Sequence, residues 1–93
     1  MVANLINERG NATANQFVIV ENGTITFQSY NSKIAVIDAN NNVSLSYNMW
    51  DYSRTTMKYL CQFLRQNGWH EIKGKKDIEK MISNGTFKTW ITL

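Results

Sequence analysis

The stretch of residues 17–28, FVIVENGTITFQ, constrains the fold more than any other part of the sequence. Two runs rich in β-branched and aromatic residues flank Asn22-Gly23, a pair that favours the type I′ turn of a two-residue hairpin loop. A loop of this length places Val18 opposite Phe27, so the apolar side chains of the two runs share one face. The sequence therefore predicts an antiparallel β-hairpin over these residues.

A second hairpin is predicted directly after the first. The runs KIAVID and NVSLSY flank Ala39–Asn42, a tetrapeptide rich in turn-forming residues. If Asp38 pairs with Val43, then Val36 lies opposite Leu45 and the serines between the apolar residues point outward. This alternation indicates a sheet with one packed face and one wetter face.

Residues 53–67 have the pattern of the main helix. Ser53 is a favourable N-cap, and Asn67-Gly68 is a favourable stop signal. Between them, apolar residues recur at i, i+3, i+4 and i+7, which is typical of a helix face that packs on a core. The residues of this stripe are Met57, Leu60, Cys61 and Leu64. We therefore expect this helix to close the core of the protein.

The remaining segments complete an α+β fold. Residues 75–84 predict a short second helix, residues 86–92 a C-terminal strand, and residues 1–16 a polar arm or loop. The whole chain is predicted to form a single domain, residues 1–93. Its core is a four-stranded antiparallel meander, residues 17–47, packed on one main helix.

Composition limits the setting in which the protein works. The single cysteine, Cys61, excludes an intrachain disulfide and a thiolate zinc cluster, and it suits a reducing cytoplasm. The longest apolar run, FVIV, is far shorter than the roughly 20 residues of a membrane-spanning helix. The N-terminal stretch also lacks the pattern of a signal peptide. We expect a cytoplasmic protein with no membrane partner.

The net charge of +3 is unevenly distributed along the chain. Residues 1–52 hold two basic and four acidic side chains, whereas residues 53–93 hold eight basic and three acidic ones. The basic half favours an anionic partner, either nucleic acid or an acidic protein surface. The alternative is an ordinary solvated lysine face, and the charge alone does not decide between the two.

The sequence lacks the parts of the common enzyme sites. Neither GxxxxGK[ST] nor GxGxxG occurs, so the usual phosphate-binding loops are absent. One histidine and one cysteine cannot build an ordinary His/Cys metal site, and the acidic residues are scattered. Ser53, His70 and Asp51 form a triad only in name, because Ser53 is better explained as a helix cap. We expect a non-enzymatic protein with no catalytic residue, cofactor or metal.

The candidate partner-binding face lies on the polar side of the main helix and on the basic run after it. Arginine and glutamine at helical spacing reach phosphates and base edges, and aromatic side chains beside them stack on bases or anchor a protein partner. The candidate residues are Tyr52, Arg54, Lys58, Gln62, Arg65, Lys73, Lys75 and Lys76. Exposed charge is also the normal pattern of a surface helix. Whether Trp50, Trp69 and Trp90 lie in the core stays open at this point.

Three stretches resemble a family of small, uncharacterised proteins encoded by bacteriophages. They are NATANQF (residues 11–17), FQSYNSKIAVID (residues 27–38) and WDYSRTTMKYLCQFL (residues 50–64). That family has an FxSYxS-like turn between strands, followed by the pattern W-x-Y-S-x-T-T-x-x-x-L-x-x-F-L. The resemblance covers roughly residues 11–65 and brings no catalytic or binding residues with it. It implies a setting, the cytoplasm of an infected host bacterium.

Three functions are compatible with these sequence features. The first is a small phage-type binding protein that inhibits or modifies a host protein or protein complex, with anti-defence activity of the anti-CRISPR kind as one form. The second is a small basic protein that binds nucleic acid through the face formed by Arg54, Lys58, Gln62 and Arg65. The third is a structural or virion-associated protein that self-assembles into homo-oligomers through a sheet edge. We expect the first.

Overall fold

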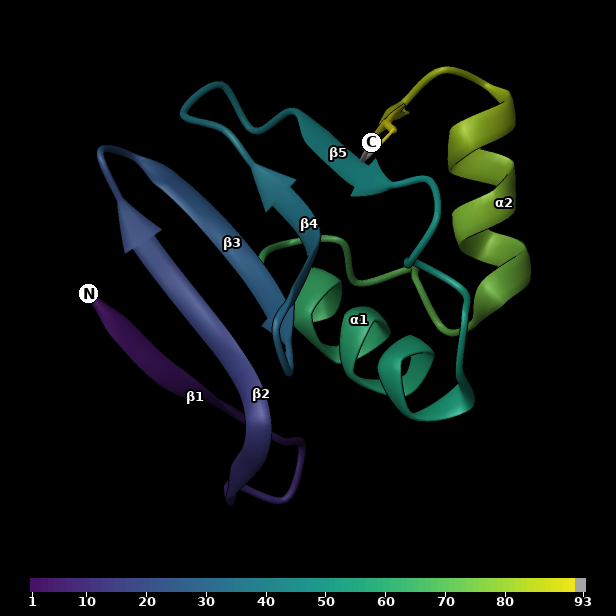
Figure 1. Ribbon diagram of the computed structural model, residues 1–93. Helices are drawn as coiled ribbons and strands as arrows, with labels where there is room; N and C mark the ends of the chain where they lie inside the picture. The colour runs from purple at the N-terminus through teal and green to yellow at the C-terminus, as the bar shows by residue number, and fades with distance from the viewer. Residues whose placement is uncertain (92–93) are drawn as a thin grey trace.

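The computed structural model describes residues 1–91 of the 93-residue chain (Figure 1). In chain order, this part of the protein forms five strands, two helices and a sixth strand. Their bounds are β1 (Val2–Ile6), β2 (Ala12–Glu21), β3 (Thr24–Ser29), β4 (Ser32–Ile37), β5 (Val43–Ser46), α1 (Arg54–Gln66), α2 (Lys75–Ser83) and β6 (Phe87–Trp90).

The six strands form one sheet in the order β1-β2-β3-β4-β5-β6, so each strand lies beside its neighbour in the chain. The first five run antiparallel, and β6 returns parallel to β5 after a crossover through both helices. A parallel pair needs such a crossover, because a tight turn joins only antiparallel neighbours. Figure 1 shows the sheet curving around α1. Helix α2 packs against β6.

The core lies between the sheet and the helices. Phe27 of β3 and Phe63 of α1 stack with ring centroids 5.5 Å apart and an interplanar angle of 26°. Trp69, which follows α1, meets Phe87 of β6 edge to face at 5.0 Å. Buried apolar residues from β1, β3, β4, β5, β6 and both helices belong to the same cluster. The helices and the sheet therefore share one core.

The predicted four-stranded meander with a separate C-terminal strand is wrong, because the structure has six strands in one mixed sheet. The first strand, β1, lies within residues 1–16, which were predicted as an arm or loop. Only Leu5 of this strand is buried, so the sequence VANLI does not need, and does not show, the alternation of apolar and polar residues that is typical of a half-buried strand. The last strand, β6, ends at Trp90; the predicted strand 86–92 reached residue 92, which lies outside the described residues. The broader α+β class holds.

The two predicted hairpin registers have different outcomes. In the first hairpin, Val18 pairs with Phe27, which is the predicted register. In the second, Ile37 rather than Asp38 pairs with Val43, so the predicted register is wrong by one residue.

The cause of this difference is the turn between β4 and β5. The Asp38 carboxylate accepts the backbone N–H groups of Asn40 and Asn42, both at 2.9 Å. The bond from the Asn42 backbone, above all, holds the pKa of the Asp38 carboxyl below its usual value. Asp38 therefore belongs to the turn rather than to the strand, which is a common role of aspartate.

Helix α1 lies within the predicted range 53–67, whose first and last residues are its caps. Ser53 Oγ accepts the backbone N–H of Thr56 at 3.1 Å, which satisfies one of the free donors of the first turn. At the other end, Gly68 adopts φ +100°, a conformation that favours glycine and ends the helix.

Replacement of Leu5 by alanine tests whether β1 belongs to the core. Leu5 is 0% exposed, whereas its neighbour Ile6 is 49% exposed. We expect Leu5→Ala to lower the free energy of unfolding by about 2–5 kcal/mol, because it removes buried methyl groups and leaves a cavity. Ile6→Ala, the matched control on the surface, should lower it by less than about 1 kcal/mol. Urea denaturation followed by circular dichroism measures both, and equal effects would contradict this placement of β1.

Candidate binding site

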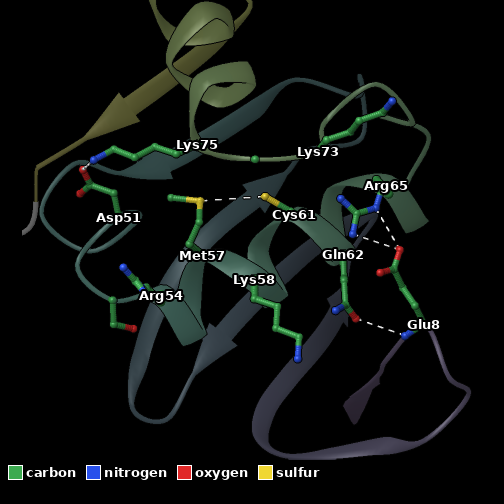
Figure 2. Close-up of a pocket in the computed structure, with 12 residues that line it drawn as sticks. Glu8, Asp51, Arg54, Met57, Lys58, Cys61, Gln62, Arg65, Lys73 and Lys75 are labelled. Carbon is green, nitrogen blue, oxygen red and sulfur yellow. Dashed lines mark hydrogen bonds and ion pairs between the residues drawn. The ribbon is translucent and has the colours of Figure 1, made fainter.

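A surface pocket of about 520 Å³ lies over α1 (Figure 2). Three further segments build the pocket together with the helix. They are the loop after β1, the residues just before α1, and residues 73–75 at the start of α2. Because α1 is held against the sheet by its opposite face, the pocket side of the helix is presented to solvent in a fixed orientation.

Two sulfur-containing side chains form the floor of the pocket. Met57 and Cys61 are four residues apart and therefore neighbours on the same side of α1, and Cys61 Sγ lies 3.9 Å from Met57 Sδ. Burial raises the pKa of the Cys61 thiol, although the Arg65 guanidinium opposes the shift. We name this apolar surface of Met57 and Cys61 the sulfur floor.

At one end of the pocket, the loop after β1 is tied to α1. Glu8 Oε2 lies 3.0 Å from Arg65 Nη2, and the backbone N–H of Glu8 donates to Gln62 Oε1 at 3.2 Å. Arg65 Nη1 also donates to the carbonyl of Ile72 at 2.6 Å. Arg65 is thus engaged with the loop on one side and with the segment after α1 on the other.

At the other end, the first residue of α2 approaches the segment just before α1. Lys75 Nζ lies 3.4 Å from Asp51 Oδ2, and the two side chains are 52% and 36% exposed. An exposed pair of this kind contributes about 0–1 kcal/mol and exchanges partners easily. The Asp77 carboxylate shapes the loop before α2, because it accepts the backbone N–H groups of Lys73 and Gly74 at 2.9 and 3.2 Å.

Three basic side chains of the pocket, Arg54, Lys58 and Lys73, have no ion pair among residues 1–91. Lys58 Nζ lies 5.3 Å from the centroid of the Tyr59 ring, a contact that leaves its charge uncompensated. Figure 2 shows the three side chains at separate points around the sulfur floor, directed away from one another. They do not converge on one point, and we name them the cation ring.

Most of the predicted partner-binding residues meet at this pocket. Those that line it are Arg54, Lys58, Gln62, Arg65, Lys73 and Lys75. Tyr52 and Lys76 are exposed but lie outside its lining. Gln62 was expected on the exposed side of the helix and is only 4% exposed, so that expectation is wrong. The loop after β1 covers Gln62 and uses its side-chain oxygen.

The tryptophans lie outside this pocket lining. Trp50 is buried at 7% exposure, and Trp69 and Trp90 are half-buried. The predicted binding residues did not include Glu8, Asp51, Ser53 and Gly74, which line the pocket as well. Glu8 contacts Arg65 across 57 residues, and no local pattern signals a contact of that range. Met57 and Cys61 were predicted only as part of the core stripe, and they also face the pocket.

Two further observations concern the described residues as a whole. Within residues 1–91, neither helix is long and apolar enough to cross a membrane. In the same range, no group of three or more His, Cys, Asp and Glu side chains is arranged to hold a metal ion.

All residues that line the pocket lie between Glu8 and Lys75. Residues 1–80 match the family described as "Family of unknown function (DUF8033)". The chain belongs to this family. The match spans the entire pocket of this DUF8033 member, but it carries no statement of phage origin or of the W-x-Y-S-x-T-T pattern. No curated protein and no solved structure matches the chain.

Alkylation of Cys61, the only cysteine of the chain, tests the sulfur floor. Only the thiolate reacts with iodoacetamide, and a raised pKa leaves less thiolate at a given pH. Near neutral pH we therefore expect the folded protein to react more slowly than the urea-unfolded chain, and the difference should shrink as the pH rises and the thiol ionises. Mass spectrometry of quenched samples measures the rates, with a short peptide around Cys61 as the unburied control. Equal rates near neutral pH would contradict a buried thiol.

Proposed function

We propose that this protein is a non-enzymatic binding protein that recognises an acidic surface of a partner protein through the α1 pocket. The observation that carries the proposal is the cation ring, three unpaired basic side chains placed around an apolar floor. The other basic residues of the pocket, Arg65 and Lys75, already have the carboxylates of Glu8 and Asp51 as partners.

The spacing of the cation ring favours several separate acidic groups over one small anion. Arg54, Lys58 and Lys73 come from two segments and point to different sides of the pocket. A single exposed ion pair contributes only about 0–1 kcal/mol, so useful affinity requires several carboxylates at matching positions. Complementary charge over such an area also steers the approach of the partner and rejects basic surfaces.

The sulfur floor favours an apolar anchor between those acidic groups. A leucine or phenylalanine of the partner, packed over Met57 with Cys61 beneath it, would contribute at most about 1.5–3 kcal/mol, the value for complete removal of such a side chain from water. Methionine adapts its shape to the side chain that contacts it. The partner segment that fits best is therefore an apolar residue flanked by aspartate or glutamate.

Nucleic acid is the second candidate, because the cation ring also attracts phosphates. One observation weighs against it. Among the described lining residues, none is aromatic, whereas proteins that bind single strands combine a basic groove with aromatic stacking.

The biological setting of the proposal comes from the resemblance to phage-encoded proteins. In the cytoplasm of an infected bacterium, a binding protein of this kind would inhibit or modify a host factor, for example a component of a defence system. Membership in a family of unknown function is compatible with this role and does not specify it.

A methyl NMR titration tests the proposed site. The chain has four methionines, of which Met57 lines the α1 pocket and Met49 lines a different hollow of the surface. The probes are the peptide Asp-Asp-Phe-Asp-Asp, its counterpart Lys-Lys-Phe-Lys-Lys, and random single- and double-stranded DNA. We expect the acidic peptide to shift the Met57 methyl signal and to leave Met49 unchanged, because the α1 pocket carries the three residues of the cation ring, whereas the described lining of the Met49 hollow carries one basic residue, Lys33. The basic peptide should shift neither signal.

A matched pair of charge-reversal variants completes this test. Arg54→Glu/Lys58→Glu/Lys73→Glu reverses the cation ring, and Lys33→Glu/Lys80→Glu/Lys88→Glu makes the same change outside the pocket. We expect the first to weaken binding of the acidic peptide about tenfold or more, since up to three pairs of as much as ~1 kcal/mol become repulsive. The second should bind like the wild type, and circular dichroism verifies that both variants fold.

The DNA arm of the titration decides between the two candidates. Nucleic acid would replace the protein partner if DNA shifts Met57, binds far more weakly at about 200 mM than at about 50 mM salt, and the acidic peptide has no effect. A lack of response to every probe would show that the α1 pocket is not the binding site.

A further inference from the structure

The exposed aliphatic side chains of the described residues gather at the β1 edge of the sheet. Large aliphatic residues with high exposure are Met1, Val2, Ile6, Val20 and Ile91. All of them except Ile91 belong to β1, to the residue before it, or to the end of β2 beside it. Apolar side chains concentrated at one place on a surface mark an interaction site.

Residues 2–4 of the β1 edge also lack a charge, a proline and a bulge, which protect many natural sheet edges; the register irregularity of β1 against β2 falls after Asn4. The whole strand, VANLI, contains no charged residue and no proline. The opposite edge strand, β6, has only four residues and carries Lys88. Because charges, prolines and short strands are the usual protection against edge-to-edge pairing, β1 is the edge that can accept another strand.

The ladder between β1 and β2 identifies which backbone groups of this edge are open. The N-terminal ammonium of Met1 donates to the Val20 carbonyl, and the Val20 N–H donates to the Met1 carbonyl, both at 2.8 Å. In an antiparallel pair, such doubly bonded positions alternate with positions whose groups point away from the neighbour. Ala3 therefore turns its N–H and C=O toward β2, whereas those of Val2 and Asn4 point outward from the sheet.

Helix α1 limits the open part of the edge. Gln66 Nε2 donates to the carbonyl oxygen of Ile6 at 2.7 Å, so the helix occupies the edge at the end of β1. The open hydrogen-bonding groups are consequently those of Val2 and Asn4, on the two sides of Ala3. This arrangement is symmetric about Ala3.

We propose that two copies of the chain pair through β1, antiparallel, about a two-fold axis at Ala3. In this register Val2 of each copy pairs with Asn4 of the other, and each such pair exchanges two N–H···O=C hydrogen bonds. The Ala3 side chains of the two copies meet at the axis, where their small size prevents a clash. One continuous sheet then runs through both copies.

A second copy is favoured over a foreign strand because the edge is complementary to itself. A two-fold axis at Ala3 places the same short strand on both sides of the interface, so a charged strand would face its own charges across the axis, and VANLI carries no charge. Val2 brings an exposed apolar side chain to the interface from both copies. The dimer also carries two α1 pockets, which would strengthen binding to a partner with repeated acidic segments.

Opposite charges placed at Ala3 test both the interface and its register. Ala3 is exposed, so Ala3→Lys and Ala3→Glu should both fold as the wild type does. Each variant alone places like charges opposite each other at the axis, and we expect self-association to weaken about fivefold or more. An equimolar mixture of the two variants should restore it, because Lys then faces Glu. Sedimentation equilibrium over a wide range of concentration measures all three samples, with Thr89→Lys on β6 as the control at the other edge.

Amide hydrogen exchange of the wild type provides a second readout that needs no variant. The amides of Val2 and Asn4 should become protected as the protein concentration rises, while Ala3, already bonded to β2, should not change. A chain that stays monomeric at every concentration would overturn the proposal. Three other results would also overturn it. The dimer could persist in both Ala3 variants, it could be disrupted by Thr89→Lys, or its formation could leave the exchange rates of the Val2 and Asn4 amides unchanged. If the Ala3 variants fail to fold, the exchange pattern of the wild type alone decides.

Discussion

The packing of α1 against the sheet is the interaction on which the rest of this structure depends. Phe63 stacks on Phe27 of β3, and the fully buried Leu60 and Leu64 fill the same interface. Because a densely packed core allows few alternative side-chain positions, this contact fixes the rotation of α1 about its own axis. The same rotation places the sulfur floor at the base of the pocket and presents two members of the cation ring to solvent. The pocket is thus a consequence of how the core is packed.

A few polar contacts hold the walls of the pocket in place, and their contributions to the free energy of folding differ. The ion pair of Glu8 with Arg65 is partly exposed, with side chains 58% and 24% accessible, and solvent screening limits its contribution to about 0–1 kcal/mol. The bond from the Glu8 backbone to Gln62 is more consequential, because Gln62 is buried and an unpaired buried group costs about 1–3 kcal/mol. The bond to Gln62 therefore holds the loop after β1 more firmly than the ion pair does. The Glu8 carboxylate can release Arg65, which is then free to pair with an acidic group of the partner.

Sequence reasoning succeeded where a feature is contained in a few neighbouring residues. The Asn22-Gly23 turn sets the register of the first hairpin, and Ser53 caps α1 where the pattern predicted. Prediction from the sequence failed where a residue can serve two structural roles, and where the apolar pattern of a strand is weak. Asp38 serves the turn instead of the strand, which moves the register of β4 and β5 by one residue. Only Leu5 of β1 is buried, so this edge strand resembles a polar arm.

Short stretches of sequence are enough to specify the first hairpin, the limits of α1 and the division of that helix into an apolar and a basic side. These properties follow from turn conformation, capping and side-chain periodicity, which act between close neighbours in the chain. Only the tertiary structure decided that Glu8 covers Gln62, that β6 lies parallel to β5, and that β1 forms the open edge of the sheet. These contacts join segments that are distant in the sequence, and their partners are selected by the shape of the shared core, which no local pattern describes.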